Sequence, residues 1–389
     1  MTREWRNAPE AGRHLQDCGS VRILHVSDCF LPRLGGIEVQ VDELARAQHA
    51  AGHDVAIATA TPGASHDPRV HRIVAPLPWE LPIGGSLRGL LRDLAPDVVH
   101  VHAGAVSPFA WRAVRRTLRA RVPTVMTVHS LWGPISELSY RALFAGWRRD
   151  GFVVTTVSEA AAAPIRSVVR GRVPIEVVSN GIDSGSWRDA SGAGRVAAGG
   201  VVHVVAVGRL APRKEPLTLL KLLAAVRAGA PIRATVVGDG PARPAMERYA
   251  RRHGMGGWLH LTGRLDRAEV RDVLAGADVF LAPAARESFG LAALEARLAG
   301  VPVVAQAGTG VADFVTSGRE GLLGRGFAGL SAALFRLVTD HDLRNTITAH
   351  NRATEPARCT WPAVLQAFDH CYTAAGVTQA TRSRTEKPR

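Results

Sequence analysis

The chain has 389 residues, of which 46% are hydrophobic and 21% are charged. This length and composition predict a globular protein with room for two domains, and they exclude a wholly disordered chain. The net charge of +14 is compatible with a nucleic acid, an anionic membrane or a polyanionic substrate. Of these, nucleic acid is the weakest candidate, because the sequence has no zinc-knuckle spacing and no RNA-binding aromatic signature.

The cysteine pattern and the N-terminus bear on location. None of the four cysteines forms a CxxC pair, so the sequence offers no disulfide framework and no metal site: Cys18, Cys29, Cys359 and Cys371. The N-terminal residues are polar and lack the apolar core of a signal peptide, and no apolar stretch is long enough to span a bilayer. We therefore expect a cytoplasmic protein and leave open a peripheral contact with the inner face of a membrane.

The first half of the chain alternates predicted strands and helices. Residues 1–20 are predicted to be a flexible tail, and Val21 to Ser27 to be the first buried strand. A loop from Asp28 to Gly36 leads into a helix over 38–51. Further strands are expected at 54–59, 98–102, 124–129, 153–158 and 175–178. This alternation predicts a parallel sheet with helices on both faces.

The second half repeats the same rhythm. Residues 184–200 are rich in Gly, Ala and Ser, which predicts an interdomain linker. Strands follow at 201–207, 234–237, 258–262, 279–282 and 302–305. The fold class is therefore α/β, with one domain over 21–183, a second over 201–360 and a crevice between them. A last helix is predicted over 361–376, followed by a flexible tail over 377–389.

Two glutamates stand eight positions apart around the end of one predicted strand. Glu287 follows the apolar run 277–283, and Glu295 lies in a predicted helix that begins at Leu291. Both are expected at the carboxyl ends of parallel strands, where open α/β sheets bind ligands. The helix N-terminus between them favours a phosphate. Two carboxylates that can bind sugar hydroxyls, beside a phosphate seat, indicate a nucleotide-sugar site, although an isolated Glu is usually solvated.

This segment resembles the Glu-x7-Glu motif of the retaining glycosyltransferases of family 4 (group 1), which have the GT-B fold of two Rossmann-like domains facing a cleft. The resemblance covers roughly residues 21–375. It implies that Glu287 holds a donor-sugar hydroxyl and that Glu295 holds the ribose hydroxyls. It implies that the backbone around Ser288, Phe289, Gly290 and Leu291 meets the distal phosphate. It also implies that the helix over 361–376 returns to the first domain.

Arg209 and Lys214 follow the predicted strand 201–207. Two fixed cations at a strand end can stabilise the charge that develops on a departing nucleoside diphosphate; two solvated surface cations are the plain alternative. The segment resembles the family's Gly-Arg-x5-Lys-Gly element, with Glu215 in place of the last Gly. By this resemblance, Arg209 and Lys214 are catalytic and no metal is required. Whether Glu215 reshapes the loop or adds a counter-charge stays open.

Gly35 and Gly36 lie between a predicted strand and a predicted helix, where glycine lets a backbone approach a ligand closely. An ordinary turn is the alternative. The setting resembles the family's Pro-x-x-Gly-Gly-x-Glu loop, matched here by Pro32, Gly35, Gly36 and Glu38. The resemblance implies that this loop faces the donor diphosphate.

His129 ends the predicted strand 124–129. A histidine there is usually a satisfied core or edge residue, but several related enzymes have one that contacts the transferred sugar; His100 and His102 are interpreted as structural. The turn at Arg264, Leu265 and Asp266 resembles the one that borders the nucleobase. Neither this turn nor the one at 237–241 matches the dinucleotide GxGxxG pattern, which argues against a dehydrogenase.

A strongly basic segment, 111–121, is predicted to be a helix in the first domain. A solvated face is its default interpretation, and an anionic membrane surface is the alternative. Aromatic side chains that could extend such a surface follow it in the chain: Trp132, Tyr140, Phe144 and Trp147, near Arg141, Arg148 and Arg149. Many relatives glycosylate lipid-linked acceptors.

The resemblance implies transfer of a hexose of the mannose, glucose or N-acetylglucosamine type from a nucleotide sugar such as GDP-mannose or a UDP-sugar, with retention. The acceptor is expected to be a glycan, a lipid-linked molecule or a small molecule. Two alternatives are a nucleotide-sugar epimerase of GT-B architecture and a binding partner without catalysis. The glutamate pair disfavours the epimerase, and the presence of both glutamates and both cations disfavours the binding partner.

Overall fold

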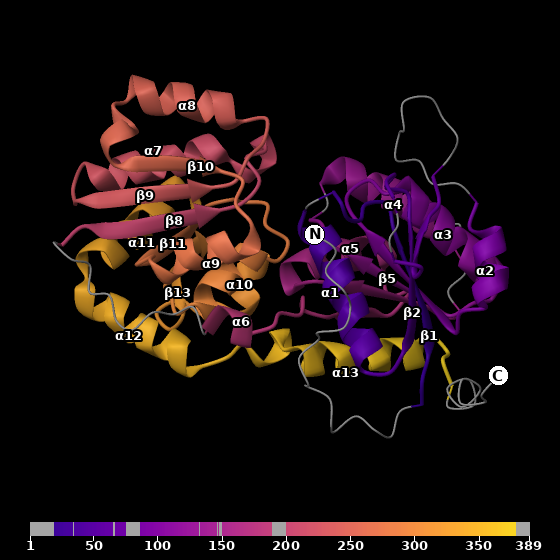
Figure 1. The fold of residues 1–389 in the computed structure, drawn as a ribbon. Coiled ribbons are helices and arrows are strands. Elements are labelled where there is room, and N and C mark those ends of the chain that lie inside the picture. Colours follow the sequence, from indigo (N-terminus) through magenta and orange to yellow (C-terminus); the bar gives the residue numbers. More distant parts are fainter. Residues whose placement is uncertain are drawn as a thin grey trace. The chain divides into compact units, whose positions relative to one another are not determined.

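The structure is a computed structural model, and it describes residues 19–33, 35–64, 67–74, 86–131, 133–145, 147, 150–188 and 200–378. The chain divides into two compact units. The first contains the residues up to Ile182 together with those from Arg358 onward, and the second runs from Asp183 to Ala357. Each unit is an α/β domain built around a parallel sheet (Figure 1).

The described residues of the first unit form a seven-stranded sheet in the order β3-β2-β1-β4-β5-β6-β7, with every neighbouring pair parallel. The strands are β1 (Arg22–Ser27), β2 (Asp54–Thr59), β3 (Val70–Arg72), β4 (Val98–Ala103), β5 (Thr124–Val128), β6 (Phe152–Thr156) and β7 (Ile175–Val177). The helices are α1 (Gly36–Ala50), α2 (Arg88–Leu94), α3 (Pro108–Arg119), α4 (Pro134–Ala145), α5 (Glu159–Val169) and α13 (Trp361–Ala374).

Helices cover both faces of this sheet. Side chains alternate along a strand, so Leu24 and Ile23 point to opposite faces. Leu24 belongs to an apolar cluster with α3, α4 and α5, whereas Ile23 belongs to a cluster with α1 and α13. Burial on both faces explains why every residue of β4, β5 and β6 is buried, with no alternation between buried and exposed positions.

The described residues of the second unit form a six-stranded parallel sheet in the order β10-β9-β8-β11-β12-β13. Its strands are β8 (Val202–Val207), β9 (Ile232–Val237), β10 (Leu259–Gly263), β11 (Val279–Ala282), β12 (Val303–Gln306) and β13 (Gly321–Gly324). Its helices are α6 (Gly185–Arg188), α7 (Pro216–Arg227), α8 (Arg243–Arg252), α9 (Arg267–Ala275), α10 (Leu291–Leu298), α11 (Gly326–Thr339) and α12 (His341–Ala353).

Several predictions need correction at this level. Residues 185–188 of the predicted linker form α6, and Trp187 in this helix is 1% exposed, with the guanidinium carbon of Arg267 5.4 Å from the centroid of its ring. Residues 189–199 of the linker lie outside the described residues. Strands β3 and β13 were not predicted. Val377, which was assigned to the flexible tail, is buried and its N–H donates to Tyr372 O. The rest of the two predicted tails falls almost wholly outside the described residues.

Candidate active site

The second sheet reverses its order between two adjacent strands, β8 and β11. In a sheet of this order, the loops that leave the carboxyl ends of the two strands run to opposite sides, which opens a crevice for ligands. Arg209 and Lys214 leave the end of β8, and Glu287 leaves the end of β11. The topology therefore brings residues more than seventy positions apart in the sequence to the same edge of the sheet.

Lys214 and Glu287 form an ion pair. Lys214 ends a short 3-10 turn, Pro212–Lys214, and its Nζ donates to Glu287 Oε2. The side chains are 28% and 19% exposed, so the pair remains open to solvent. Arg209, two residues after the end of β8, is exposed to solvent. A bound phosphate would find Lys214 held in place by its partner carboxylate.

Glu215 stands where the resembling element has glycine, and its backbone explains that preference. Its φ is +53°, in the left-handed region that favours glycine. The residue thus keeps the turn that a glycine would make, and α7 begins directly after it. Its Oε1 accepts a hydrogen bond from Ala285 N at 3.4 Å. Glu215 therefore ties the loop that carries Lys214 to the loop that carries Glu287.

The turn from Glu287 to Leu291 is fixed by close backbone packing. Phe289 is 2% exposed and its ring lies 5.3 Å from that of Phe314, so its side chain belongs to the core. Gly290 has φ +98° and precedes the first turn of α10. Gly310 N donates to Glu287 O, and a Cβ at Gly310 would lie 2.1 Å from Ser288 O. Backbone N–H groups, and not the Phe289 side chain, are what this turn can offer to a phosphate.

The remaining predicted donor residues of this unit lie on neighbouring elements. Glu295 lies one turn into α10 and is partly buried. Arg264, Leu265 and Asp266 follow β10, with Arg264 exposed and Leu265 partly buried. The Asp266 carboxylate caps α9 by accepting from Glu269 N at 2.9 Å. This capping bond occupies Asp266 with a structural role, which leaves Arg264 as the more available side chain of that turn.

The sequence did not predict the structural role of the glycine-rich turn at 237–241, which is a close backbone contact with the segment that follows β8. A Cβ at Gly238 would lie 2.0 Å from Gly208 O, and a Cβ at Gly240 would lie 2.5 Å from Leu210 O. Both glycines have positive φ, and Leu210 N donates to Asp239 O. The turn therefore packs directly on the backbone that flanks Arg209. Its glycines support the position of a predicted catalytic residue from a distant part of the sequence.

In the first unit, Gly35 and Gly36 lie at the start of α1, after the loop that leaves β1. The backbone of Gly35 is extended, and a Cβ there would lie 2.4 Å from Glu38 Oε2. Glu38 is 5% exposed and pairs with Arg33 at 3.2 Å. Glycine at position 35 thus makes room for the Glu38 carboxylate, while Gly36 is exposed at the helix N-terminus.

His129 follows the end of β5 in the first unit. Its Nε2 lies 3.0 Å from His102 Nδ1 on β4, and burial lowers the pKa of His129 to about 4. The ring is therefore neutral at physiological pH. The structure joins His129, a predicted site residue, and His102, a residue predicted to be structural, in one hydrogen-bonded pair.

The proposed aromatic surface of the first unit is wrong for three of its members. Tyr140, Phe144 and Trp147 are at most 9% exposed and belong to the apolar core beside α3. Trp132, Arg148 and Arg149 lie outside the described residues. The basic helix α3 does have an exposed arginine face, formed by Arg112, Arg115, Arg116 and Arg119. In the described part of the chain, no helix has the length and apolarity needed to cross a membrane.

Comparison with known proteins gives a consistent assignment. Residues 34–185 match the family "Glycosyltransferase Family 4", and residues 197–354 match "Glycosyl transferases group 1". A GDP-mannose-dependent alpha-mannosyltransferase of Mycobacterium tuberculosis (strain CDC 1551 / Oshkosh) is 30% identical, over 79% of this chain and 84% of that protein. Glycogen synthase of Mycobacterium tuberculosis (strain H37Rv) is 29% identical, over 91% of this chain and 95% of that protein.

Among solved structures, HepE from Anabaena in complex with UDP and glucose superimposes with a TM-score of 0.72. It covers 91% of this chain and 100% of its own, at 19% identity, which supports the fold. The predicted GT-B architecture of two Rossmann-like domains is confirmed. The chain belongs to the group 1 family of glycosyltransferases and is an enzyme that transfers a sugar from a nucleotide sugar.

Proposed function

We propose that the enzyme transfers a hexose, with retention at the anomeric carbon, from a nucleoside-diphosphate sugar to a glycan, lipid-linked or small-molecule acceptor. Mannose from GDP-mannose is the first candidate, with UDP-linked glucose or N-acetylglucosamine next. The names of the relatives support this range, because they include GDP-mannose-dependent mannosyltransferases, an N-acetylglucosaminyltransferase subunit and glycogen synthase.

The observation that carries the proposal is the Lys214–Glu287 ion pair at the point where the second sheet reverses its strand order. In the proposed role, Lys214 and Arg209 stabilise the negative charge that grows on the leaving diphosphate. Glu287 accepts a hydrogen bond from a hydroxyl of the donor sugar. Because the two cations supply the positive charge, the proposed reaction needs no metal.

The other predicted residues complete the proposed donor site. Glu295 binds the ribose hydroxyls, and N–H groups from Ser288 to Leu291 meet the distal phosphate at the N-terminus of α10. Arg264 and Leu265 border the base, with the backbone of Asp266 beside them. From the first unit, we propose that the N-terminus of α1 at Gly35 and Gly36 contacts the diphosphate. His129 is proposed to contact the transferred sugar.

Retention is proposed to follow from attack on the same face that the diphosphate leaves, with a leaving phosphate oxygen taking the proton of the acceptor hydroxyl. This route requires no covalent nucleophile on the protein. The exposed arginine face of α3 is proposed as the surface that meets an anionic membrane when the acceptor is lipid-linked, at about 1 kcal/mol for each basic residue near such a surface.

A panel of GDP-, UDP- and ADP-sugars, tested without added metal, examines the proposal. We expect one donor to raise the thermal midpoint of the protein and to release its nucleoside diphosphate slowly by hydrolysis. NMR of the transferred product should then show the same anomeric configuration as the donor. Conversion of a donor to its epimer without any acceptor would replace the proposal with the epimerase. Inversion at the anomeric carbon would overturn the retaining mechanism.

A further inference from the structure

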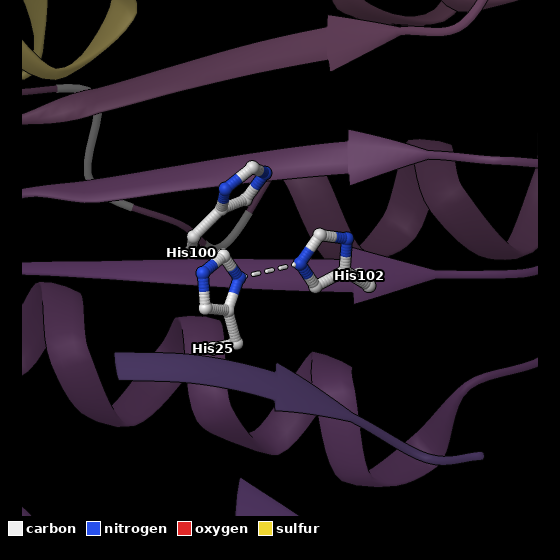
Figure 2. Close-up of side chains that lie close together, drawn as sticks. All are labelled: His25, His100 and His102. Carbon is white, nitrogen blue, oxygen red and sulfur yellow. Dashed lines mark hydrogen bonds between the residues drawn. The ribbon is translucent and has the colours of Figure 1, made fainter. Parts of the chain in front are cut away.

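A layer of polar side chains lies inside the otherwise apolar core between the first sheet and the helices α1 and α13. Because side chains alternate along a strand, His25 shares the face of Ile23, and His100 and His102 share the face of Val98. That face is covered by α1 and α13. Seven polar side chains of this layer are at most 2% exposed: His25, Gln48, His100, His102, Thr127, Thr155 and Tyr372. Figure 2 shows the three histidines of this layer on adjacent strands.

The layer continues inward from His129 as a chain of short contacts. His129 Nε2 lies 3.0 Å from His102 Nδ1. His102 Nε2 lies 2.9 Å from His25 Nδ1, which is the dashed line in Figure 2. His25 Nε2 then lies 2.7 Å from Gln48 Oε1 on α1. The rings of His102 and His25 each use both nitrogens, one toward each neighbour in this series of contacts.

The chain continues from Gln48 to the C-terminal helix and back to the sheet. Gln48 Nε2 donates to the Tyr372 hydroxyl at 2.7 Å. That hydroxyl lies 2.9 Å from His100 Nδ1, and His100 Nε2 lies 2.6 Å from Thr127 Oγ1. Thr127 Oγ1 lies 2.6 Å from Thr155 Oγ1. Seven consecutive hydrogen bonds thus join His129 to Thr155 through α1 and α13.

The direction of the chain follows from donor and acceptor chemistry. A neutral imidazole has one donor and one acceptor nitrogen. Gln48 Oε1 can only accept, so His25 Nε2 donates and His25 Nδ1 accepts. His102 Nε2 must then donate and its Nδ1 accept, which makes His129 Nε2 a donor. Burial keeps the rings neutral, because it lowers the pKa of His25 to about 4 and lowers that of His102 well below its usual value.

We infer that Gln48, His25 and His102 are positioning residues that hold His129 as the Nε2–H tautomer and present its Nδ1 as a hydrogen-bond acceptor. Among the described residues, none makes a hydrogen bond to His129 Nδ1. His129 and His102 line a small pocket together with Asn180, Gly181 and Trp361. The inference rests on the proposed function, in which a hydroxyl of the transferred sugar donates to this nitrogen.

The same histidines suggest a metal site, and the hydrogen bonds argue against it. His25, His100 and His102 each offer a ring nitrogen, and these atoms lie within 4.8 Å of one another. However, both nitrogens of all three rings already have a protein partner. A metal ion would have to break the His25–His102 bond or displace the partners of His100. The layer satisfies its polar atoms as a hydrogen-bonded chain, as buried polar groups require.

The direct test is the tautomeric state of His129 by long-range ¹H–¹⁵N NMR of protein labelled at histidine, at pH 7.5. The resonance is assigned by its loss in His129→Asn. We expect Nε2 to be protonated and Nδ1 to be unprotonated. A dominant Nδ1–H form would overturn the inference, and so would about one equivalent of tightly bound metal in elemental analysis of the purified wild-type protein.

Substitution of Gln48 tests whether the tautomer of His129 depends on the hydrogen bonds that link it to Gln48. Gln48→Met removes the acceptor for His25 and keeps a similar shape, so we expect His129 to become a mixture of tautomers. Gln40→Met is the matched control. Gln40 is also a buried glutamine on α1, but its amide donates to Gly181 O, which is not part of the series of hydrogen bonds from His129 to Thr155. It should leave the His129 tautomer unchanged. If Gln48→Met does not fold, Tyr372→Phe removes one oxygen and should give a smaller shift in the same direction.

The activity readout separates this inference from the proposed function. With a donor in hand, Gln48→Met should lower kcat about 10- to 100-fold, as for a misplaced catalytic contact, and change KM less than about twofold. An unchanged tautomer in folded Gln48→Met would overturn the positioning role, whatever the activity. Lack of turnover with every donor would instead count against the proposed function, while the tautomer measurement would still stand.

Discussion

The two sheets share one strand order around their centre, but their polar side chains lie in different places. In the second unit, the candidate residues Arg209, Lys214 and Glu287 lie on loops beyond the strand ends. The buried histidine of its first strand, His203, is satisfied locally by Gly276 O and Thr235 Oγ1, each at 2.8 Å. In the first unit, buried histidines on adjacent strands are joined into one chain that reaches His129.

This difference shows two ways of fixing candidate site residues on the same kind of sheet. The second unit fixes its loops by backbone contact, through glycines that admit a neighbouring carbonyl, and by the two side-chain bridges from Lys214 and Glu215. The first unit fixes the His129 side chain through a buried layer of polar side chains. The histidines of this layer must stay neutral, and their ring nitrogens must keep their hydrogen bonds. The first arrangement should be sensitive to steric change and the second to protonation.

The largest expected effect concerns the ion pair of the second unit. Glu287→Gln should reduce transfer by about 10²- to 10³-fold or more, because it removes the carboxylate that is proposed to bind the donor sugar and releases Lys214 from its partner. The measurement is kcat/KM with the donor found in the screen. Glu247→Gln is the control, since Glu247 pairs with Arg243 on the surface of α8.

A double variant sharpens this result. If Lys214 and Glu287 act as a unit, Lys214→Met combined with Glu287→Gln should cost little more than the worse single change. Fully additive losses would show that the two residues act independently. Retention of wild-type activity in Glu287→Gln would remove this residue from the proposed site.

The second effect is acid destabilisation of the first unit. The pKa of His25 falls from 6.5 to about 4 on burial, so the unfolded chain binds more protons than the folded one between these values. The free energy of unfolding therefore rises with pH across this window. The contribution from neutral His25 is fully present above about pH 6.5 and is lost progressively as the pH falls toward 4. His25 alone should cost about 2 kcal/mol between pH 6.5 and 5. The pKa values of His100 and His102 are also lowered by burial and add to this loss.

Calorimetry between pH 5 and 7.5 checks this expectation. The transition that includes the first unit should shift to lower temperature more steeply than that of the second unit. In the second unit, burial lowers the pKa of His203 as well, but the other histidine of the described six-stranded sheet, His260 on β10, is exposed. Equal shifts of both transitions, or no shift, would contradict the account of the neutral polar layer.

Much of the fold and the motif formed by Glu287 and Glu295 could be predicted from the sequence, because both depend on local pattern. Apolar runs separated by helical segments predicted most strands of both sheets. The fixed spacing of Glu287 and Glu295 identified a family that the comparisons confirm. Strand β3 was missed because Val70–Arg72 is short and mostly polar, and β13 because Gly321–Gly324 has glycine at both ends.

What local pattern could not predict were contacts between distant residues. The chain from Tyr372 through Gln48 to His129 joins residues hundreds of positions apart, and no spacing in the sequence signals it. Helical periodicity likewise shows that Tyr140 and Phe144 share a helix, but it does not show which face is covered, and both proved to be core residues. The roles of Gly35 and Gly310 also depend on which atoms fold against them.

A third, smaller effect should follow from a steric change under the Glu287 turn. In Gly310→Ala, the new Cβ would lie 2.1 Å from Ser288 O and 2.6 Å from Phe289 Cα, so the backbone must shift. We expect a loss of about 1–3 kcal/mol in the free energy of unfolding, measured in urea, together with weaker donor binding. Gly256→Ala is the control, because a Cβ there meets no atom within 4 Å. Equal stability of the two variants would show that the turn is not held by this contact.

The smallest expected effect concerns Glu215, where two terms oppose each other. Glu215→Gly relieves a left-handed backbone strain of about 1 kcal/mol, but it removes the hydrogen bond from Ala285 N, which contributes a similar amount. The free energy of unfolding should therefore change by less than about 1 kcal/mol in urea titration. Glu215→Ala separates the terms, since it keeps the strain and loses the bond, and it should be the less stable of the two variants. If Glu215→Ala were as stable as Glu215→Gly, the strain at this position would be absent, and the loops of the second unit would not depend on backbone conformation there.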